Sequence, residues 1–194
     1  MPADRRDLLR DAAIEVLAGS GSRGLTHRAV DEAARVPSGT AKNYFPSREA
    51  LLRAVAERCV ELYLAAGERL AARRPPRDRA QLTAFLAGLL HDAAGPGRDR
   101  LLAYQELQAE SSRRPWLSAV LDPVAAADFP AFEQAQRAAG LPVTAERAAV
   151  VTLALHAALP HLLSAGPATL AASGLDDPER FVRALLDTVY PHRQ

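Results

Sequence analysis

Four polar or cationic residues follow one another closely in sequence between positions 38 and 44. Ser38 and Thr40 offer hydroxyl groups, and Lys42 and Asn43 follow with a cation and an amide. Side chains of these types hydrogen-bond to base edges in the major groove of DNA. The same segment would make a poor core helix, because it has few apolar side chains to bury. Its composition therefore indicates a short helix that reads a nucleic-acid groove.

Lys42 is the only lysine of the chain, and every other Lys or Arg position is an arginine. Its position has two interpretations, chance in an arginine-rich sequence or placement for a groove contact. The net charge is only +1, and residues 1–50 hold eight Lys and Arg against seven Asp and Glu. Binding to DNA must therefore depend on localised positive groups rather than on a broad basic surface.

The elements that would position these side chains lie between residues 25 and 52. Thr26 is predicted to cap a first short helix. Val36 then fills a tight turn, and Pro37 stands where a first-turn proline costs no hydrogen bond. The second short helix, residues 38–44, ends at Phe45-Pro46, and Ser47 caps a long third helix. This order predicts a helix-turn-helix.

The segment resembles the DNA-binding head of the TetR family of bacterial transcriptional regulators, whose signature runs roughly V-x-x-G-T-x-x-x-Y-F-x-[ST]-[KR]-[DE]-x-L. The matching residues are Val36, Gly39, Thr40, Tyr44, Phe45, Ser47, Arg48, Glu49 and Leu51. The chain departs from the family at Arg35, where glycine is usual, and at Pro37, where a capping residue is frequent. An arginine in a left-handed turn carries some strain.

The resemblance implies an all-α fold with an N-terminal three-helix head, residues 1–46, and a larger helical body, residues 47–194, for effector binding and dimerisation. It also implies a sequence-specific regulator, which we expect to be a repressor that a small-molecule effector releases from its operator. The expected partners are near-palindromic double-stranded DNA, a second copy of the chain and an unknown effector. The alternatives are a regulator of the same fold without an effector, or a helical interaction protein that has lost DNA binding.

The expected DNA-binding residues fall into two groups. Base contacts are assigned to the second helix of the motif, and backbone contacts to the helix ends around it. The full set is Thr26, His27, Arg28, Ser38, Gly39, Thr40, Lys42, Asn43, Tyr44 and Arg48.

Apolar periodicity predicts helices through the rest of the chain. They cover residues 4–18, 47–72, 80–94 and 99–112, a region 115–140 broken or kinked at Pro123 and Pro130, a helix starting at Thr144, and a last helix starting at Asp177. Residues 19–24 are expected to form a loop. The charged segment 73–79 is interpreted as a solvated connector, with a second DNA contact as the alternative.

Two further sets of residues follow from the body helices. The resemblance implies an effector pocket, for which the candidates are Tyr63, Phe85, Tyr104, Gln105, Gln108, Trp116, Phe129 and Phe132, although each taken singly fits an ordinary core. The helix from Thr144 is apolar on more than one side, which points to a subunit interface. Its candidates, with those of the last helix, are Val151, Leu155, Leu159, Leu162, Phe181, Leu185 and Val189.

Several classes of function find no support in the sequence. His91, His156 and His161 lack the spacing of a metal site, and no catalytic motif or phosphate-binding loop occurs, so we expect no enzyme, cofactor or metal. The single Cys59 permits no intrachain disulfide and fits a reducing cytoplasm, as a packing residue or alternatively as a redox sensor. The N-terminus is charged, and no uninterrupted apolar run could span a bilayer, so we expect a cytoplasmic protein with no membrane partner.

Overall fold

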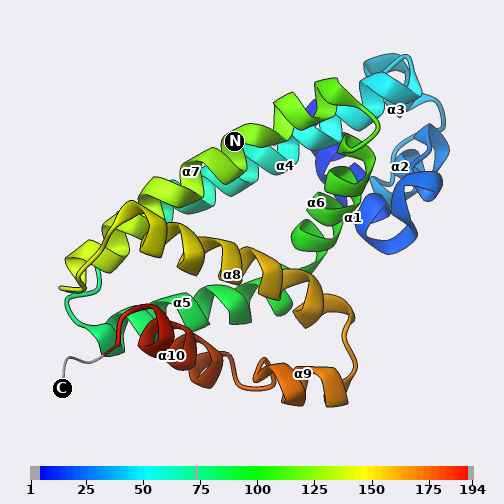
Figure 1. Cartoon of the computed structure of the whole chain (residues 1–194). Helices are drawn as coiled ribbons and strands as arrows, with labels where there is room; N and C mark the ends of the chain where they lie inside the picture. The colour runs from blue at the N-terminus through cyan, green and yellow to red at the C-terminus, as the bar shows by residue number, and fades with distance from the viewer. Residues whose placement is uncertain (1–4, 73, 192–194) are drawn as a thin grey trace. The chain divides into compact units, whose positions relative to one another are not determined.

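The computed structural model describes residues 5–72 and 74–191, and every regular element within them is an α-helix (Figure 1). The helices, in chain order, are α1 Arg5–Gly24, α2 His27–Ala33, α3 Thr40–Tyr44, α4 Arg48–Ala71, α5 Arg79–Ala94, α6 Arg98–Ser111, α7 Pro115–Ala138, α8 Ala145–Ser164, α9 Pro167–Ser173 and α10 Pro178–Val189. The predicted all-α fold is confirmed.

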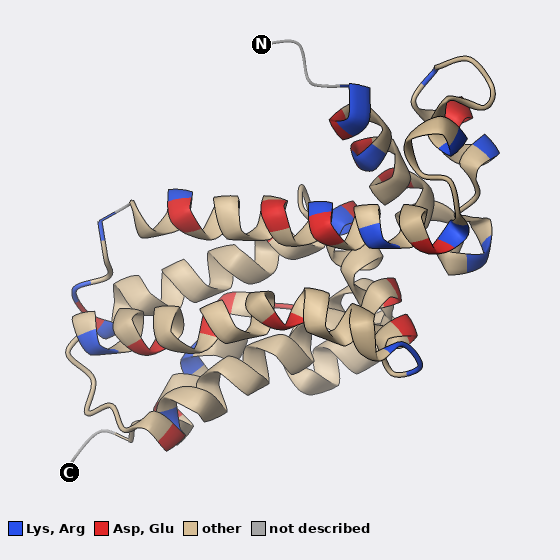
Figure 2. Ribbon diagram, turned by 90° about the horizontal axis from the view of Figure 1, so that it is seen from above, with Lys and Arg blue, Asp and Glu red and all other residues tan. Residues whose placement is uncertain are grey.

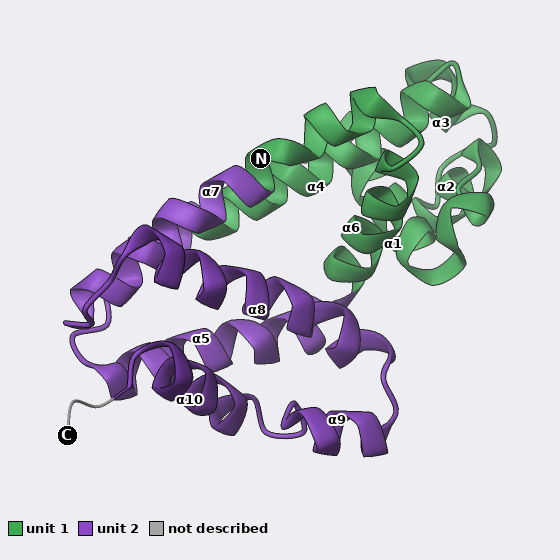
Figure 3. Ribbon diagram, in the orientation of Figure 1, with its two compact units in different colours: residues 1–67, 99–124 green, residues 68–98, 125–194 purple. Residues whose placement is uncertain are grey.

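The chain forms two compact units, and neither is continuous in sequence (Figure 3). Unit 1 comprises residues 1–67 and 99–124, and unit 2 comprises residues 68–98 and 125–194. Helices α4 and α7 each contribute to both units. The helix-turn-helix therefore shares its compact unit with α6 and the first half of α7.

The core of unit 1 is made by α1 to α4 together with α6 and the start of α7. Its fully buried side chains include Leu9, Leu17, Leu25, Val30, Phe45, Leu51, Val55, Leu107 and Leu117. A charged network also holds α1 on α4. Arg10, which is buried, bonds to Glu61 at 2.5 Å, and Arg58 bonds to Asp11 at 2.7 Å. The head is thus fixed to the first half of α4 by both apolar and ionic contacts.

Unit 2 is centred on α5, α8 and α10. Its buried side chains include Leu82, Leu86, Val151, Leu155, Val182, Leu186 and Tyr190. The Tyr190 hydroxyl donates to the buried side chain of Gln136 at 2.9 Å, and Arg79 of α5 bonds to Asp187 at 2.7 Å. These polar contacts attach the C-terminal end of α10 to α5 and α7.

Helix ends agree closely with the local capping signals. Thr26, Thr144 and Asp177 each accept a hydrogen bond from a backbone amide of the helix that follows, and Ser47 accepts one from Ala50 at 3.0 Å. Each cap satisfies an amide that has no partner within its own helix. The predicted starts of these four helices are therefore confirmed.

Three local expectations need correction. Residues 19–24 are not a loop, because α1 continues through them with a break at Gly21, where φ is +64°. Pro123 and Pro130 do not break the region 115–140, because α7 runs uninterrupted from Pro115 to Ala138. The short helix α9 had no counterpart among the predicted elements. Each proline removes one intrahelical hydrogen bond. The buried side chains of Leu117, Leu121 and Val124 hold α7 on the core around the bond that is lost at Pro123.

Helix α8 is the one described helix that is long and apolar enough to cross a membrane by length and composition. The core helix of a soluble protein passes the same test, and Val151 and Leu155 of α8 are buried in unit 2. The polar side chains of Thr152 and His156 also interrupt it. The other side of the helix presents apolar groups outward, since Val150 is 51% exposed and Leu153 56%.

Candidate nucleic-acid interface

The turn between α2 and α3 contains two residues in the left-handed backbone conformation. Arg35 has φ +54° and Gly39, which precedes α3, has φ +90°. A non-glycine residue in this region costs about 1 kcal/mol, so the chain accepts strain at Arg35 where most of the family has glycine. Val30, Ala41 and Phe45 are fully buried and hold the two helices on the core.

Asp31 of α2 fixes the start of α3, and its role was not predicted from the sequence. The residue is only 2% exposed. One carboxylate oxygen accepts from the Gly39 amide and the other from the Ala41 amide, both at 2.7 Å. The carboxylate therefore caps a helix that lacks a capping side chain of its own, because the residue preceding α3 is glycine.

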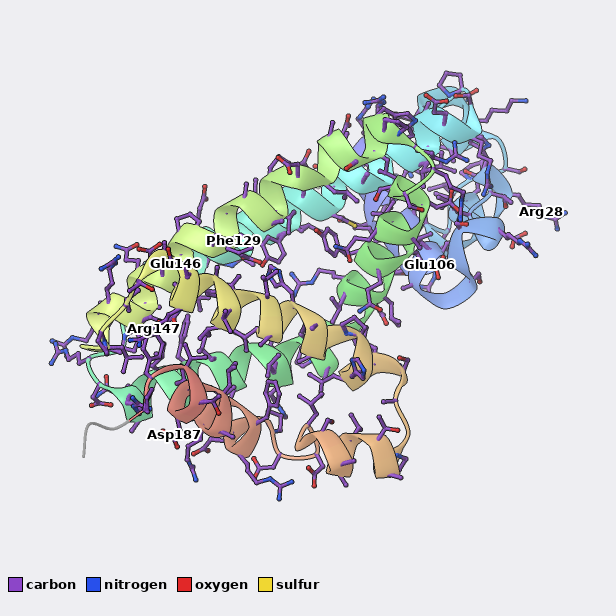
Figure 4. The ribbon with its side chains drawn as sticks, viewed as in Figure 1. Arg28, Glu106, Phe129, Glu146, Arg147 and Asp187 are labelled. Carbon is purple, nitrogen blue, oxygen red and sulfur yellow. The ribbon has the colours of Figure 1, made fainter. Side chains whose placement is uncertain are left out.

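Three of the residues expected to contact the DNA backbone already have partners within the chain. The His27 ring nitrogen Nε2 lies 2.6 Å from the Phe45 carbonyl oxygen, at the end of α3. Arg48 donates to the Leu25 carbonyl at 2.7 Å and also to the carbonyl of Ser22. Arg28 pairs with Glu32 one turn along α2, but it stays open to solvent, with a side chain that is 85% exposed (Figure 4).

The remaining residues of the predicted set are accessible. Ser38, Lys42 and Asn43 are exposed, and Tyr44 is 39% exposed and stands beside the Phe45 ring. Thr40 is partly covered, and its hydroxyl donates to the Pro37 carbonyl at 2.5 Å. Helix α3 begins at Thr40 rather than at the predicted Ser38. Lys42 and Asn43 of α3, with Ser38 in the turn before it, thus expose an ammonium group, an amide and a hydroxyl, which are donor and acceptor types that can read base edges.

Charges of both signs occur along the first four helices rather than one basic face (Figure 2). The exposed cations nearest α3 in sequence are Arg35, Lys42 and Arg48, and Glu32 and Glu49 lie exposed among them. This distribution agrees with localised rather than broad electrostatic attraction. Arg48 serves partly as a structural group, because it donates hydrogen bonds to two main-chain carbonyls.

The residues proposed for an effector pocket are divided between the two units. Tyr63, Tyr104, Gln105, Gln108 and Trp116 belong to unit 1, and Phe85, Phe129 and Phe132 belong to unit 2. Tyr104 and Trp116 pack against the core of unit 1, whereas Phe85 and Phe132 pack against that of unit 2. The Gln105 side-chain nitrogen is buried with no hydrogen-bond partner among the described residues. The assignment of these eight residues to a pocket stays a prediction.

The residues proposed for a dimer interface also differ in accessibility. Val151 and Leu155 are buried in the core of unit 2, and the other five, Leu159, Leu162, Phe181, Leu185 and Val189, are partly buried against it. The apolar side chains that α8 leaves most open are Val150 and Leu153. The sequence pattern identified an apolar helix, but the most exposed face lies one or two residues away from the positions chosen.

These features define a helix-turn-helix protein with a helical body, and comparisons with known proteins place it more narrowly. The model of the C-terminal domain described as tetracyclin repressor-like matches residues 77–189. The model of the tetR family of bacterial regulatory proteins matches residues 9–55. The chain therefore belongs to the TetR family and is a DNA-binding transcriptional regulator. A comparison with curated proteins gives no match.

Solved structures of the same fold cover nearly the whole chain. The multidrug binding protein EbrR complexed with ethidium has 26% identity and a TM-score of 0.67, over 97% of this chain and 100% of that one. A TetR family member from Streptomyces coelicolor A3 has 24% identity and a TM-score of 0.67, over 97% and 99%. A transcriptional regulator from Rhodococcus sp. Rha1 has 19% identity and a TM-score of 0.69, over 96% and 94%.

Proposed function

We propose that this regulator is a homodimeric repressor that binds a near-palindromic operator in the cytoplasm and leaves it when a small molecule binds the body. The exposed polar face of α3, held in place by Asp31, carries the DNA-binding part of the proposal. The response to a ligand is supported by the likeness to EbrR, which has been crystallised with ethidium, proflavin and malachite green.

The reading surface is assigned to Ser38, Lys42 and Asn43, with Gly39 and Thr40 allowing close approach of the backbone. Lys42 faces guanine acceptors and Asn43 faces adenine or a phosphate. Arg28, Thr26 and Tyr44 contact the phosphate backbone beside it. His27 and Arg48 contribute to the same surface chiefly by holding the ends of α3 and α4, since each is bonded to main-chain carbonyls.

Dimerisation would supply the operator symmetry. A twofold dimer through the C-terminal helices presents two copies of α3, and its half-sites are then about 34–36 Å apart or a multiple of that distance. The exposed apolar groups Val150 and Leu153 of α8 give such an interface an apolar contribution. A monomer at micromolar concentration in light scattering would contradict this assembly.

Selection of bound fragments from a random DNA library tests the proposal directly. We expect enrichment of one near-palindromic sequence, and enrichment of none would refute sequence-specific binding. With the operator known, Lys42→Ala should cost about 1–3 kcal/mol and relax the preference at one position. The matched control is Arg28→Ala, which removes an exposed cation and should weaken binding to every sequence alike, with a salt slope lower by about one.

A further inference from the structure

The turn that joins α2 to α3 holds an arginine in a backbone conformation that suits glycine (Figure 1). Arg35 has φ +54° and is the one non-glycine residue with a positive φ in the described part of the chain. The other residues with a positive φ are Gly21, Gly39, Gly140 and Gly174. A side chain in this conformation crowds the backbone, and glycine avoids that crowding. The arginine therefore makes the turn less stable than a glycine would.

The hydrogen bonds at the end of α2 require this conformation. The Arg35 amide donates to the Glu32 carbonyl at 3.2 Å. The Val36 amide donates to the Asp31 carbonyl at 3.0 Å. These two bonds form a Schellman motif, in which the residue after the helix cap is left-handed and is usually glycine. The turn thus sets the backbone angle at position 35, whatever side chain stands there.

The Arg35 side chain makes no contact that would offset this strain. It is exposed, and within the described residues it forms no hydrogen bond, ion pair or ring contact. Glu32, the exposed acid nearest to it in sequence, pairs instead with Arg28 at 2.9 Å. An exposed charge adds almost nothing to stability even when it is paired. Strained backbone of this kind is concentrated at functional sites, so position 35 is a candidate for a function outside the fold.

Arg35 lies on the same short turn as the start of the proposed reading surface. Ser38 follows three residues later, and both residues are exposed. The Thr40 amide donates to the Pro37 carbonyl at 3.1 Å, which fixes the segment that leads into α3. A protein element that enters a groove of DNA has charged phosphates beside it, about 3.4 Å apart along each strand. Because the first 50 residues carry nearly balanced charges, individual exposed cations must supply the attraction to DNA.

We propose that Arg35 binds a phosphate of the DNA backbone beside the groove that α3 reads. Its guanidinium group offers paired N–H donors that match two phosphate oxygens. The contact adds affinity without reading a base, so its loss weakens binding to every sequence alike. This inference rests on the proposed function, to which it adds a contact that offsets the strain in the turn.

Arg35→Gly tests the proposal, because stability and DNA affinity should change in opposite directions. Glycine relieves the left-handed strain, so the midpoint of urea denaturation should rise. The affinity should fall roughly five- to tenfold for each bound subunit at about 0.1 M salt. The slope of the logarithm of affinity against the logarithm of salt concentration should fall by about one for each bound subunit.

Fluorescence anisotropy measures both quantities on two DNAs, the selected operator and a duplex of arbitrary sequence. Unchanged affinity and slope on both DNAs would overturn the proposal. A lower urea midpoint for Arg35→Gly would overturn the strain argument on which it stands.

Two further variants separate a local contact from a general effect of charge. Arg35→Lys keeps both the positive charge and the strain, and it should bind both DNAs within about twofold of the wild type. Arg77→Gly makes the same chemical change at an exposed position before α5 and should leave affinity and slope unchanged. The proposal is wrong if Arg77→Gly loses as much affinity as Arg35→Gly, because net charge is then the cause. It is also wrong if Arg35→Lys loses as much as Arg35→Gly.

Failure of this inference is distinguishable from failure of the proposed function. If the chain selects an operator and Arg35→Gly binds it like the wild type, the regulator stands and only the contact at Arg35 is wrong. If the chain selects no operator but Arg35→Gly binds the arbitrary duplex more weakly and with a smaller salt slope, the contact stands and sequence-specific binding is wrong.

Discussion

The carboxylate of Asp31 should contribute more to the stability of the helix-turn-helix than any exposed charge near it, and Asp31→Ala tests this. The substitution leaves the amides of Gly39 and Ala41 without their acceptor, and the bond to Ala41 is buried. A hydrogen bond to a charged group is worth about 1.5–3 kcal/mol when its loss leaves a buried partner unsatisfied. Water can reach the partly buried Gly39 amide, so the loss of that bond lowers the stability by a smaller amount. We expect a loss of about 2–4 kcal/mol in the free energy of unfolding.

Urea denaturation followed by circular dichroism measures this loss, and operator binding is then measured under conditions where the variant is folded. The matched control is Glu32→Ala, which removes the adjacent carboxylate. Glu32 is exposed and forms an ion pair with the exposed Arg28, so its loss should stay within about 0.5 kcal/mol. Asp31→Asn, which keeps one acceptor oxygen, should fall between the two. Equal stability of the Asp31→Ala and Glu32→Ala proteins would refute the capping argument.

Three further predictions concern self-association of the chain, the reactivity of Cys59 and the stability of the protein at acid pH. Leu153→Arg should keep the helices and weaken self-association in light scattering, whereas Leu155→Arg, at a position only 4% exposed, should unfold the chain; a fully dimeric Leu153→Arg protein would remove that face from the interface. Burial raises the pKa of Cys59 to about 12, so iodoacetamide at pH 8 should modify it only after urea unfolding, and rapid modification of the native chain would contradict this. The Ser22 hydroxyl and then Arg114 lower the pKa of Glu110 below its ordinary 4.5, so its contribution is present above pH 4.5 and lost as the pH falls through the lowered value. Glu110→Gln should therefore be less stable than the wild type near pH 7 and approach it in acid, and a stability gap independent of pH would show that the charge does not matter.

Helix starts were predictable from the sequence because a cap is decided within three residues. Thr26, Thr144 and Asp177 each bond to an amide two or three positions ahead, and no distant contact is needed to choose them. The exposed face of α3 was predictable for a similar reason, since its residue types are unsuited to a core. The motif and the family followed from that short stretch alone.

The missed role of Asp31 and the wrong predictions for α7 and α8 depend on the elements that pack against these helices. The sequence did not single out Asp31, because its partners at Gly39 and Ala41 meet it only when α2 and α3 are packed together. Local rules for proline predicted a broken α7, but they do not include the buried contacts that hold a long helix together. Periodicity showed that α8 is apolar around much of its surface, and it gave no means to decide that Leu155 faces the core and Leu153 faces outward.

The sharing of α6 and α7 with the helix-turn-helix has a consequence for how such a regulator acquires a new target. The core of unit 1, to which Val30, Ala41 and Phe45 belong, also includes Leu107 and Leu117, which lie far along the chain. Exchange of a contiguous N-terminal fragment between relatives should therefore disturb that core. Ser38, in the turn before α3, and Lys42 and Asn43 of α3 are free of this constraint, because all three are exposed and only Ala41 is buried among them. On the assignment proposed above, single substitutions at these three exposed positions should change operator preference at little cost in folding. Evolution of specificity in this chain is expected to proceed by point changes on α3 rather than by exchange of the whole head.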